Sequence, residues 1–277
     1  MKWRCSVFPC GFIAIILLIL TAFAPAEAGL TVSGGLLMVN VTPGQHISHV
    51  INVSTEKTDP SMNIQVDVNG FGQKLDGAND DLPTKLDVSP YSARPFLNVT
   101  PNKFSLVPGG TKKILLNVDV PQDVGKGGKY ALVNIYSPPI IIGILSVVIA
   151  VDVPVVLTIA ETEQIKKGEI VDLEISKPVS VEQQNVSVIL KNTGNYHYKA
   201  FVEAVLIDKM GKILANTSSP VSLTSILPFT LRIFDLSLVP RVPLDPGNYY
   251  VNATVRLENN TIIANREAAF TVTGRGK

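Results

Sequence analysis

The sequence is poor in the side chains that carry out chemistry: it has 2 cysteines and 3 histidines in 277 residues. Both cysteines, Cys5 and Cys10, lie in the first ten residues, and there is no Gly-x-Ser-x-Gly motif. His46 and His49 are three residues apart, which on a strand places them on opposite faces, so they are not expected to share a metal. His197 follows a turn and is predicted to be a solvated loop residue. We therefore expect no enzyme activity and no cofactor.

The chain also lacks an excess of either charge. Lysine and arginine number 24 against 23 acidic residues, which gives a formal net charge of +1, and the basic residues form no cluster. A nearly neutral chain of this kind argues against a nucleic acid or an anionic membrane surface as partner. A small-molecule substrate is not expected either, which leaves a protein or a cell-envelope component.

The first 28 residues are predicted to be a signal peptide. Met1 to Arg4 form a short basic lead, Phe12 to Phe23 form an apolar run, and Ala26 to Ala28 form a small-x-small cleavage site, so the mature chain begins at Gly29. The run is shorter than the roughly 20 residues of a spanning helix. The alternative is a retained N-terminal anchor. Either way the protein is predicted to be exported, extracellular or at the cell surface, and its mature part has no thiol.

Two stretches far apart share one pattern. Pro121 precedes Tyr130 by nine residues, Pro240 precedes Tyr249 by nine residues, and each tyrosine follows a Gly-x pair between two strand-like segments. This is typical of a corner in an immunoglobulin-like β-sandwich, where the tyrosine hydroxyl bonds back to the preceding backbone. We therefore predict an all-β protein with two tandem immunoglobulin-like sandwiches and structural corners at Tyr130 and Tyr249.

Alternating apolar and polar residues support this class. The clearest strands run over 62–68, 114–120 and 249–257, and no segment has a convincing helical period. Residues 70–90 are rich in Gly, Asp, Asn and Pro and are predicted to be a long surface loop. The predicted organisation is a signal peptide at 1–28, a first sandwich at 29–160, a linker at 161–168, a second sandwich at 169–273 and a tail at 274–277.

Residues 138–160 are the most apolar part of the mature chain. Pro138, Pro139 and Pro154, with the charge of Asp152, argue against a membrane span. The interpretation is an oily loop at 140–145 followed by a long closing strand at 146–159. If exposed, the loop and the strand edge would bind a protein; the alternative is that they are core. The residues concerned are Ile140, Ile141, Ile142, Ile144, Leu145, Val147, Ile149 and Val151, with Tyr196 and Tyr198 as a smaller candidate surface.

Two further patterns point to surface sites. Asp76, Asp80 and Asp81 cluster carboxylates as calcium requires, but their spacing differs from the EF-hand pattern and suits an ordinary solvated loop. Seven Asn-x-Ser/Thr sequons are present, and three are predicted to accept glycan without disturbing a core. Those three are Asn252 on an outward strand face, and Asn216 and Asn259 in predicted turns.

The motifs also carry a family resemblance. Residues 40–43, 98–110 and 128–136 resemble the PapD-like immunoglobulin fold, in the version found in exported proteins of the WxL-interacting type. Residues 186–194 and 244–249 resemble the cell-adhesion-related CARDB type. The resemblance implies a pilus-chaperone role, in which an arginine near the mature N-terminus and a lysine in the interdomain cleft hold a client's terminal carboxylate. The chain has no Arg or Lys between Gly29 and Glu56, which departs from that pattern.

These observations favour an exported, non-enzymatic cell-surface or adhesion-type protein that binds another macromolecule through loops or a strand edge. The first alternative is an assembly chaperone of periplasmic type that binds clients by β-strand addition. The second alternative is an accessory protein anchored in the membrane by residues 12–23.

Overall fold

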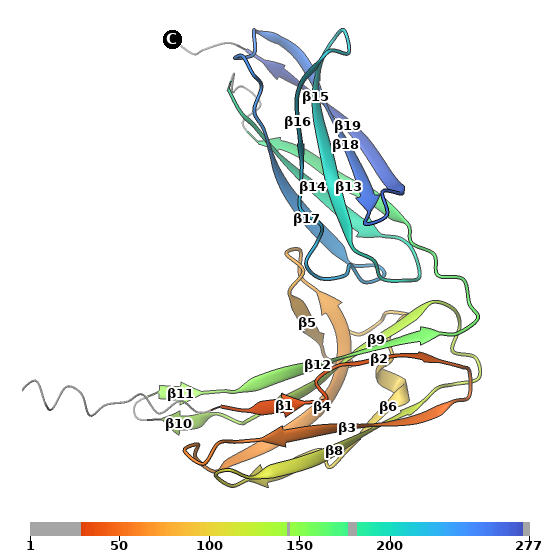
Figure 1. Ribbon diagram of the computed structural model, residues 1–277, viewed down its shortest axis with the longest axis vertical. Coiled ribbons are helices and arrows are strands. Elements are labelled where there is room, and N and C mark those ends of the chain that lie inside the picture. Colours follow the sequence, from red (N-terminus) through yellow and green to blue (C-terminus); the bar gives the residue numbers. More distant parts are fainter. Residues whose placement is uncertain (1–28, 143–144, 177–181, 274–277) are drawn as a thin grey trace, which may run out of the picture.

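The computed structural model describes residues 29–142, 145–176 and 182–273, and the regular secondary structure in these is strand apart from one short 3₁₀ helix. Two β-sandwiches lie end to end with a sharp bend between them (Figure 1). One apolar core draws its members from Leu37 to Ile159 and the other from Ile170 to Val272. The predicted all-β class with two tandem immunoglobulin-like sandwiches is therefore confirmed.

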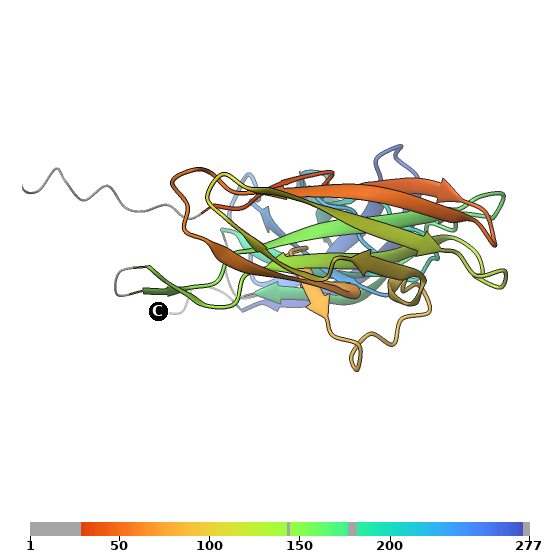
Figure 2. The same ribbon diagram turned by 90° about the horizontal axis from the view of Figure 1, so that it is seen from below.

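The first sandwich consists of two facing sheets, whose layers are seen edge-on in Figure 2. One sheet has the order β1-β3-β8-β6. Its strands are β1 (Thr31–Ser33), β3 (His46–Ser54), β8 (Thr111–Asp119) and β6 (Leu97–Thr100). The other sheet has the order β2-β12-β9-β4-β5, with β7 also paired to β4. Its strands are β2 (Leu37–Val41), β12 (Ala150–Ile159), β9 (Gly128–Tyr136), β4 (Met62–Gln73), β5 (Asn79–Leu82) and β7 (Lys103–Leu106). A short 3₁₀ helix, η1 (Arg94–Phe96), precedes β6.

The second sandwich has a three-stranded sheet facing a four-stranded one. The first has the order β13-β14-β17, with strands β13 (Gly168–Ser176), β14 (Gln184–Asn192) and β17 (Leu231–Leu238). The second has the order β16-β15-β18-β19, with strands β16 (Ile213–Ser218), β15 (Ala200–Asp208), β18 (Gly247–Leu257) and β19 (Ile262–Val272).

Alternation in the sequence explains which residues make the cores. Ile114, Leu116 and Val118 in β8 are fully buried, and their neighbours face outward. In β18, Val251, Ala253 and Val255 are buried and alternate with exposed or half-buried residues. Strand β9 is different, because Lys129 to Val133 are all buried. Its second face is covered because the second sandwich packs against it at the bend.

The tyrosine of the second corner bonds to its own sandwich. The Tyr249 hydroxyl donates to the carbonyl oxygen of Asp245 at 2.8 Å, and its ring packs against Phe270. The bond ties the start of β18 to the segment that precedes it, which is the geometry of a tyrosine corner.

Replacing Tyr249 by Phe keeps the buried ring and removes this hydrogen bond. We expect the second sandwich to lose about 1 kcal/mol of unfolding free energy, the usual contribution of one such bond. Tyr250→Phe is the control, since the Tyr250 hydroxyl bonds to no described residue. Urea unfolding of the two variants should differ by that amount, and equal midpoints would contradict the role of the corner.

Candidate functional site

The predicted oily loop is a β-hairpin. Strands β10 (Ile140–Ile142) and β11 (Leu145–Val147) pair antiparallel, with Ile140 opposite Val147 and Ile141 opposite Ser146. The loop prediction is therefore wrong, because consecutive β-branched residues on both sides of a short connection favour paired strands. The hairpin projects from the first sandwich (Figures 1 and 2). The side chain of Ile141 is 75% exposed, and Ile144 lies outside the described residues.

The predicted long strand over 146–159 is also corrected: β11 ends at Val147 and β12 begins at Ala150. Two bonds close the base of the hairpin. The Ser137 amide donates to the Ile149 carbonyl at 2.9 Å, and the Ile149 amide donates to the Ser137 hydroxyl at 3.1 Å. Ile149 packs against the first core, so it anchors the hairpin. Val151, two residues further on, is half-buried.

Strand β12 presents its backbone groups in alternation. The backbone groups of successive strand residues point to opposite sides. The carbonyl of Ile149 bonds toward β9, so the odd-numbered residues bond to β9. The Ala160 amide bonds to the Val41 carbonyl, so the even-numbered residues face β2. Pro154, which has no amide hydrogen, falls on the even side and leaves the β9 pairing intact.

Strand β2 covers only part of β12. It pairs in parallel with Val155 to Ile159, starting at Leu37. Within the described part of the chain, Ala150 to Pro154 pair with β9 alone. The amides and carbonyls of Ala150 and Asp152 therefore point outward without a strand beside them, whereas the carbonyl of Pro154 already faces β2 at Leu37. We call Ala150 to Pro154 the open edge.

Polar side chains lie on the outer face of the sheet beside the open edge. Asp152 accepts a hydrogen bond from the Asn134 amide group at 2.7 Å. On the next strand along, the Tyr136 hydroxyl donates to Asp67 at 2.8 Å. These bonds hold two carboxylates across β12, β9 and β4, which makes this face negative.

The predicted calcium residues divide between a turn and a strand. Asp76 accepts a hydrogen bond from the Ala78 amide at 2.9 Å, while Asp80 and Asp81 lie in β5. Partial burial raises the pKa of Asp81, the hydrogen bond from Asn69 lowers it, and three neighbouring carboxylates raise it further. Those carboxylates belong to Asp152, Asp67 and Asp80. No group of three metal-binding side chains occurs in residues 29–142, 145–176 and 182–273.

The predicted surface loop at 70–90 is corrected as well, since it contains the end of β4 and all of β5. This β4–β5 hairpin reaches the second sandwich (Figure 1). The Gln73 side chain donates to Ser225 at 2.8 Å and accepts from Leu227 at 3.0 Å, and the Ile233 amide donates to the Leu75 carbonyl at 3.0 Å. The hairpin therefore braces the bend.

The first corner tyrosine bonds across the junction rather than to its own sandwich. The Tyr130 hydroxyl accepts from the His197 amide at 3.0 Å and is hydrogen-bonded to His197 Nδ1 at 3.1 Å. The predicted upstream bond of Tyr130 and the predicted solvated His197 are therefore both wrong. The Gly128 amide donates to the Asn195 carbonyl at 2.9 Å, which brings this segment against β9. Burial, aided by Lys166, lowers the pKa of His197 to about 4, so the imidazole is neutral at pH 7.

The smaller surface predicted at Tyr196 and Tyr198 is not an open platform. Tyr198 is 4% exposed and donates to the Lys167 carbonyl at 3.0 Å. Tyr196 stacks on His197 at 4.2 Å, and its hydroxyl lies 3.0 Å from that of Thr158. Tyr196 therefore contacts β12 across the junction, whereas Tyr198 belongs to the core of the second sandwich.

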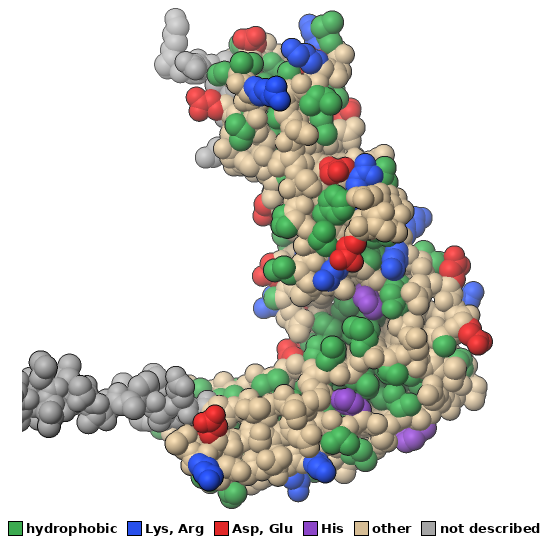
Figure 3. Space-filling model, viewed as in Figure 1, with side chains coloured by type: hydrophobic (Ala, Val, Ile, Leu, Met, Phe, Trp, Pro, Cys, Tyr) green, Lys and Arg blue, Asp and Glu red, His purple; other side chains and the backbone are tan. Residues whose placement is uncertain are grey.

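Apolar contacts complete the bend. Tyr130, Val156 and Leu227 form a small cluster with Phe71 and Tyr91 packed on it. The Tyr91 ring also lies 5.5 Å from that of Phe229. Figure 3 shows apolar side chains gathered at this bend. Since the cluster joins residues of both sandwiches, the junction is a packed interface.

The predicted glycosylation residues lie far along the chain from the open edge, in the second sandwich. Asn252 is exposed in β18, and Asn259 is exposed in the turn after it. Asn216 lies in β16, opposite Val205, so its predicted turn is corrected to a strand.

The sequence signals missed two features that position the site. A proline inside an apolar strand indicates an edge position, so Pro154 could have revealed the open edge. Gln73 and Asn195 carried no such signal. Gln73 bonds to Ser225, which lies more than 100 positions further along the chain. The Asn195 carbonyl meets the Gly128 amide only because the chain folds at the junction.

No family model and no curated protein sequence matches the chain. Among solved structures, the class 5 fimbriae chaperone CfaA aligns at a TM-score of 0.40 and 18% identity, covering 89% of this chain and 100% of its own. The CsuC–CsuE chaperone–adhesin subunit complex of Acinetobacter baumannii aligns at 0.42 and 8%, covering 76% and 91%. The PapD-like domain 7 of human CEP192 aligns at 0.34 and 12%, covering 59% and 99%. With TM-scores and identities this low, we take the function from the geometry of this chain.

Gly127→Ala tests the junction. Gly127 has φ +83°, and an added Cβ would collide with the Asn195 backbone carbonyl of the other sandwich. We expect a loss of about 1–3 kcal/mol by overpacking, on top of about 1–2 kcal/mol for the left-handed backbone. Calorimetry should show the two sandwiches unfolding separately.

Gly125→Ala is the matched control. Gly125 belongs to the same turn and has φ +78°, but its added Cβ would meet nothing closer than Lys129 Nζ at 3.8 Å. Gly125→Ala should therefore lose only the roughly 1–2 kcal/mol of unfolding free energy that the left-handed backbone costs. Equal losses in the two variants would contradict a tight junction at Asn195.

Proposed function

We propose that this chain is an exported, non-enzymatic cell-surface or adhesion-type protein that binds an extended segment of a protein partner at the open edge. The observation that carries the proposal is the single-sided pairing of Ala150 to Pro154 in β12. Backbone groups left on a strand edge are a template for another strand. A partner strand lying beside β12, end to end with β2, would hydrogen-bond to the outward amides and carbonyls of Ala150 and Asp152.

The surroundings of the open edge define the chemistry of the partner. Ile141 and Val148, exposed by 75% and 55%, supply apolar area at one end. Asp152 and Asp67 supply negative charge along the sheet face. A segment that alternates apolar side chains with lysine or arginine would therefore fit best, because complementary charge favours correct register.

The histidines support a binding role over catalysis. His46 Nδ1 lies 2.7 Å from an Asp119 carboxylate oxygen, and His49 Nε2 lies 2.9 Å from the Gly34 carbonyl. His197 is engaged by Tyr130 at the junction. Each histidine has a separate structural partner, so the three form no common catalytic site.

A second candidate is an assembly chaperone that binds unfolded clients by strand addition. The open edge favours it, whereas the coverage of Val155 to Ile159 by β2 favours a structural module. Lys129 of β9 pairs with Leu157, away from the open edge. It is buried and donates to the Pro90 carbonyl at 2.7 Å, so it does not serve a client's carboxylate. We also propose that the first sandwich is of the WxL-interacting type and the second of the CARDB type. The identity of the binding partner would test both assignments.

Membrane anchoring is the third candidate. The described segments contain no helix long and apolar enough to cross a bilayer, and the predicted anchor at 12–23 lies outside them. Sequencing the N-terminus of the exported protein separates the two forms, since cleavage gives Gly29 and retention gives Met1.

Ala150→Pro tests strand addition. It removes one outward amide hydrogen and leaves the bonds to β9, as Pro154 already does two residues later. Photo-cross-linking on intact cells, from a probe at position 141, should capture a partner protein with the parent chain and at least tenfold less with the variant. Ala150→Val keeps the amide and should capture as the parent does.

Equal capture by Ala150→Pro and the parent would contradict binding through the open edge. The identity of the captured protein then separates the candidates. A folded surface protein supports the adhesion-type role, whereas a newly exported subunit that is later released supports the chaperone.

A further inference from the structure

Sequons are more frequent in this chain than its composition requires. Seven asparagines begin Asn-x-Ser/Thr with no intervening proline, whereas random placement of serine and threonine, about an eighth of the residues, would give about two. These asparagines are Asn40, Asn52, Asn98, Asn185, Asn216, Asn252 and Asn259. The excess calls for an explanation beyond β-sheet composition.

The folded chain places these asparagines where an attached group would meet solvent. Six of the seven are exposed, and the seventh, Asn52, is half-buried. By contrast, the two buried asparagines that hold the junction, Asn192 and Asn195, stand outside sequons. Exposure is what a bulky polar modification requires.

Two of the sequons lie side by side on one sheet face. Asn216 in β16 and Asn252 in β18 both pair with Val205 of β15, one from each side. Two residues further along, Ser218 and Thr254 both pair with Glu203. Both sequons therefore run in the same direction and in register, with their asparagines about 10 Å apart across two strand spacings.

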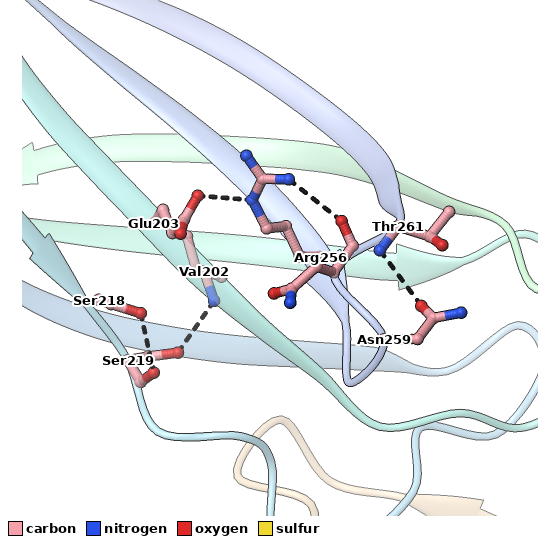
Figure 4. Close-up of polar contacts among 8 residues, drawn as sticks. Val202, Glu203, Ser218, Ser219, Arg256, Asn259 and Thr261 are labelled. Atoms are coloured by element: carbon pink, nitrogen blue, oxygen red, sulfur yellow. Dashed lines mark hydrogen bonds and ion pairs between the residues drawn. The ribbon is translucent and has the colours of Figure 1, made fainter.

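The third sequon lies at the end of the same sheet. The Asn259 side-chain oxygen accepts from the Thr261 amide at 3.2 Å, and its amide nitrogen points away from that bond (Figure 4). Arg256 steadies the turn, since it donates to the Asn260 carbonyl at 3.1 Å and to Glu203 at 2.6 Å (Figure 4). The Nδ2 atoms of Asn216, Asn252 and Asn259 bond to no other residue of the described ranges.

We propose that Asn216, Asn252 and Asn259 carry N-linked glycans, which cover the outer face of the β16-β15-β18-β19 sheet. The co-substrate is an oligosaccharide linked to a lipid phosphate. Asparagine Nδ2 forms a bond to the anomeric carbon and loses one proton, while the bond from that carbon to the phosphate oxygen breaks and the lipid phosphate leaves with the electron pair.

The glycans leave the proposed binding surface bare. Strands β4, β5, β9, β10, β11 and β12 contain no sequon, and none begins between Asn98 and Asn185. Sugar on the second sandwich would keep its large sheet from other surfaces while the hairpin and open edge stay accessible. The glycan proposal rests on the sequons and on their exposure in the folded chain, and it does not require the open edge to bind.

Thr254→Ala tests the site at Asn252, because it removes the sequon and keeps the asparagine. The full chain is recovered from the cells that export it, and its intact mass is measured. We expect the parent to exceed the polypeptide mass by its sugars and Thr254→Ala to lose one glycan. Thr254→Ser should keep that glycan, as should Asn248→Gln, which changes an exposed asparagine of the same strand outside any sequon.

Ser218→Ala and Thr261→Ala apply the same test to Asn216 and Asn259, and fragmentation of the peptides places each sugar on its residue. A parent mass equal to that of the polypeptide would overturn the proposal. Sugar found on serine or threonine in place of these asparagines would also overturn it. So would a Thr254→Ala variant that carries the same mass of sugar as the parent.

Discussion

The alternating direction of the β12 backbone governs the organisation of the first sandwich. Odd-numbered residues bond to β9 along the whole strand, whereas even-numbered residues bond to β2 only from the Pro154 carbonyl onward. The chain tolerates Pro154 within a strand for this reason, because its missing amide hydrogen falls on the side without a neighbour. In the same geometry, the outward amides of Ala150 and Asp152 have no neighbouring strand in the described part of the chain to bond to. The proposal of strand addition rests on this arrangement and on no assumption about family.

The junction between the two sandwiches fixes the position of the sheet that carries the open edge. Gly127 and Gly128 allow the Asn195 backbone to approach β9, and the Tyr130 hydroxyl then bonds to His197. Gln73, at the end of β4, adds further bonds to the second sandwich. Because polar bonds and an apolar cluster both span the bend, the second sandwich supports the outer face of the sheet that carries the open edge.

Sequence reasoning succeeded where side chains alternate. Met62, Ile64 and Val66 alternate with polar residues, so their strand and its buried face followed from periodicity. It failed where apolar residues are continuous, as in the hairpin at Ile140 to Val147, since such runs do not reveal their pairing. It failed again at His197 and Tyr130, because no local pattern indicates that two residues 67 positions apart will meet. The open edge was foreseen as a strand, but its exact extent depends on where β2 begins, which periodicity does not set.

Amide hydrogen exchange at Asp152, measured by NMR on the intact chain without partner, tests the account most directly. The Asp152 amide faces the open edge and should exchange orders of magnitude faster than those of Val151 and Val153, which bond to β9, and of Val156, which bonds to β2. An Asp152 amide as protected as that of Val156 would mean that the edge is already closed, and would contradict the account.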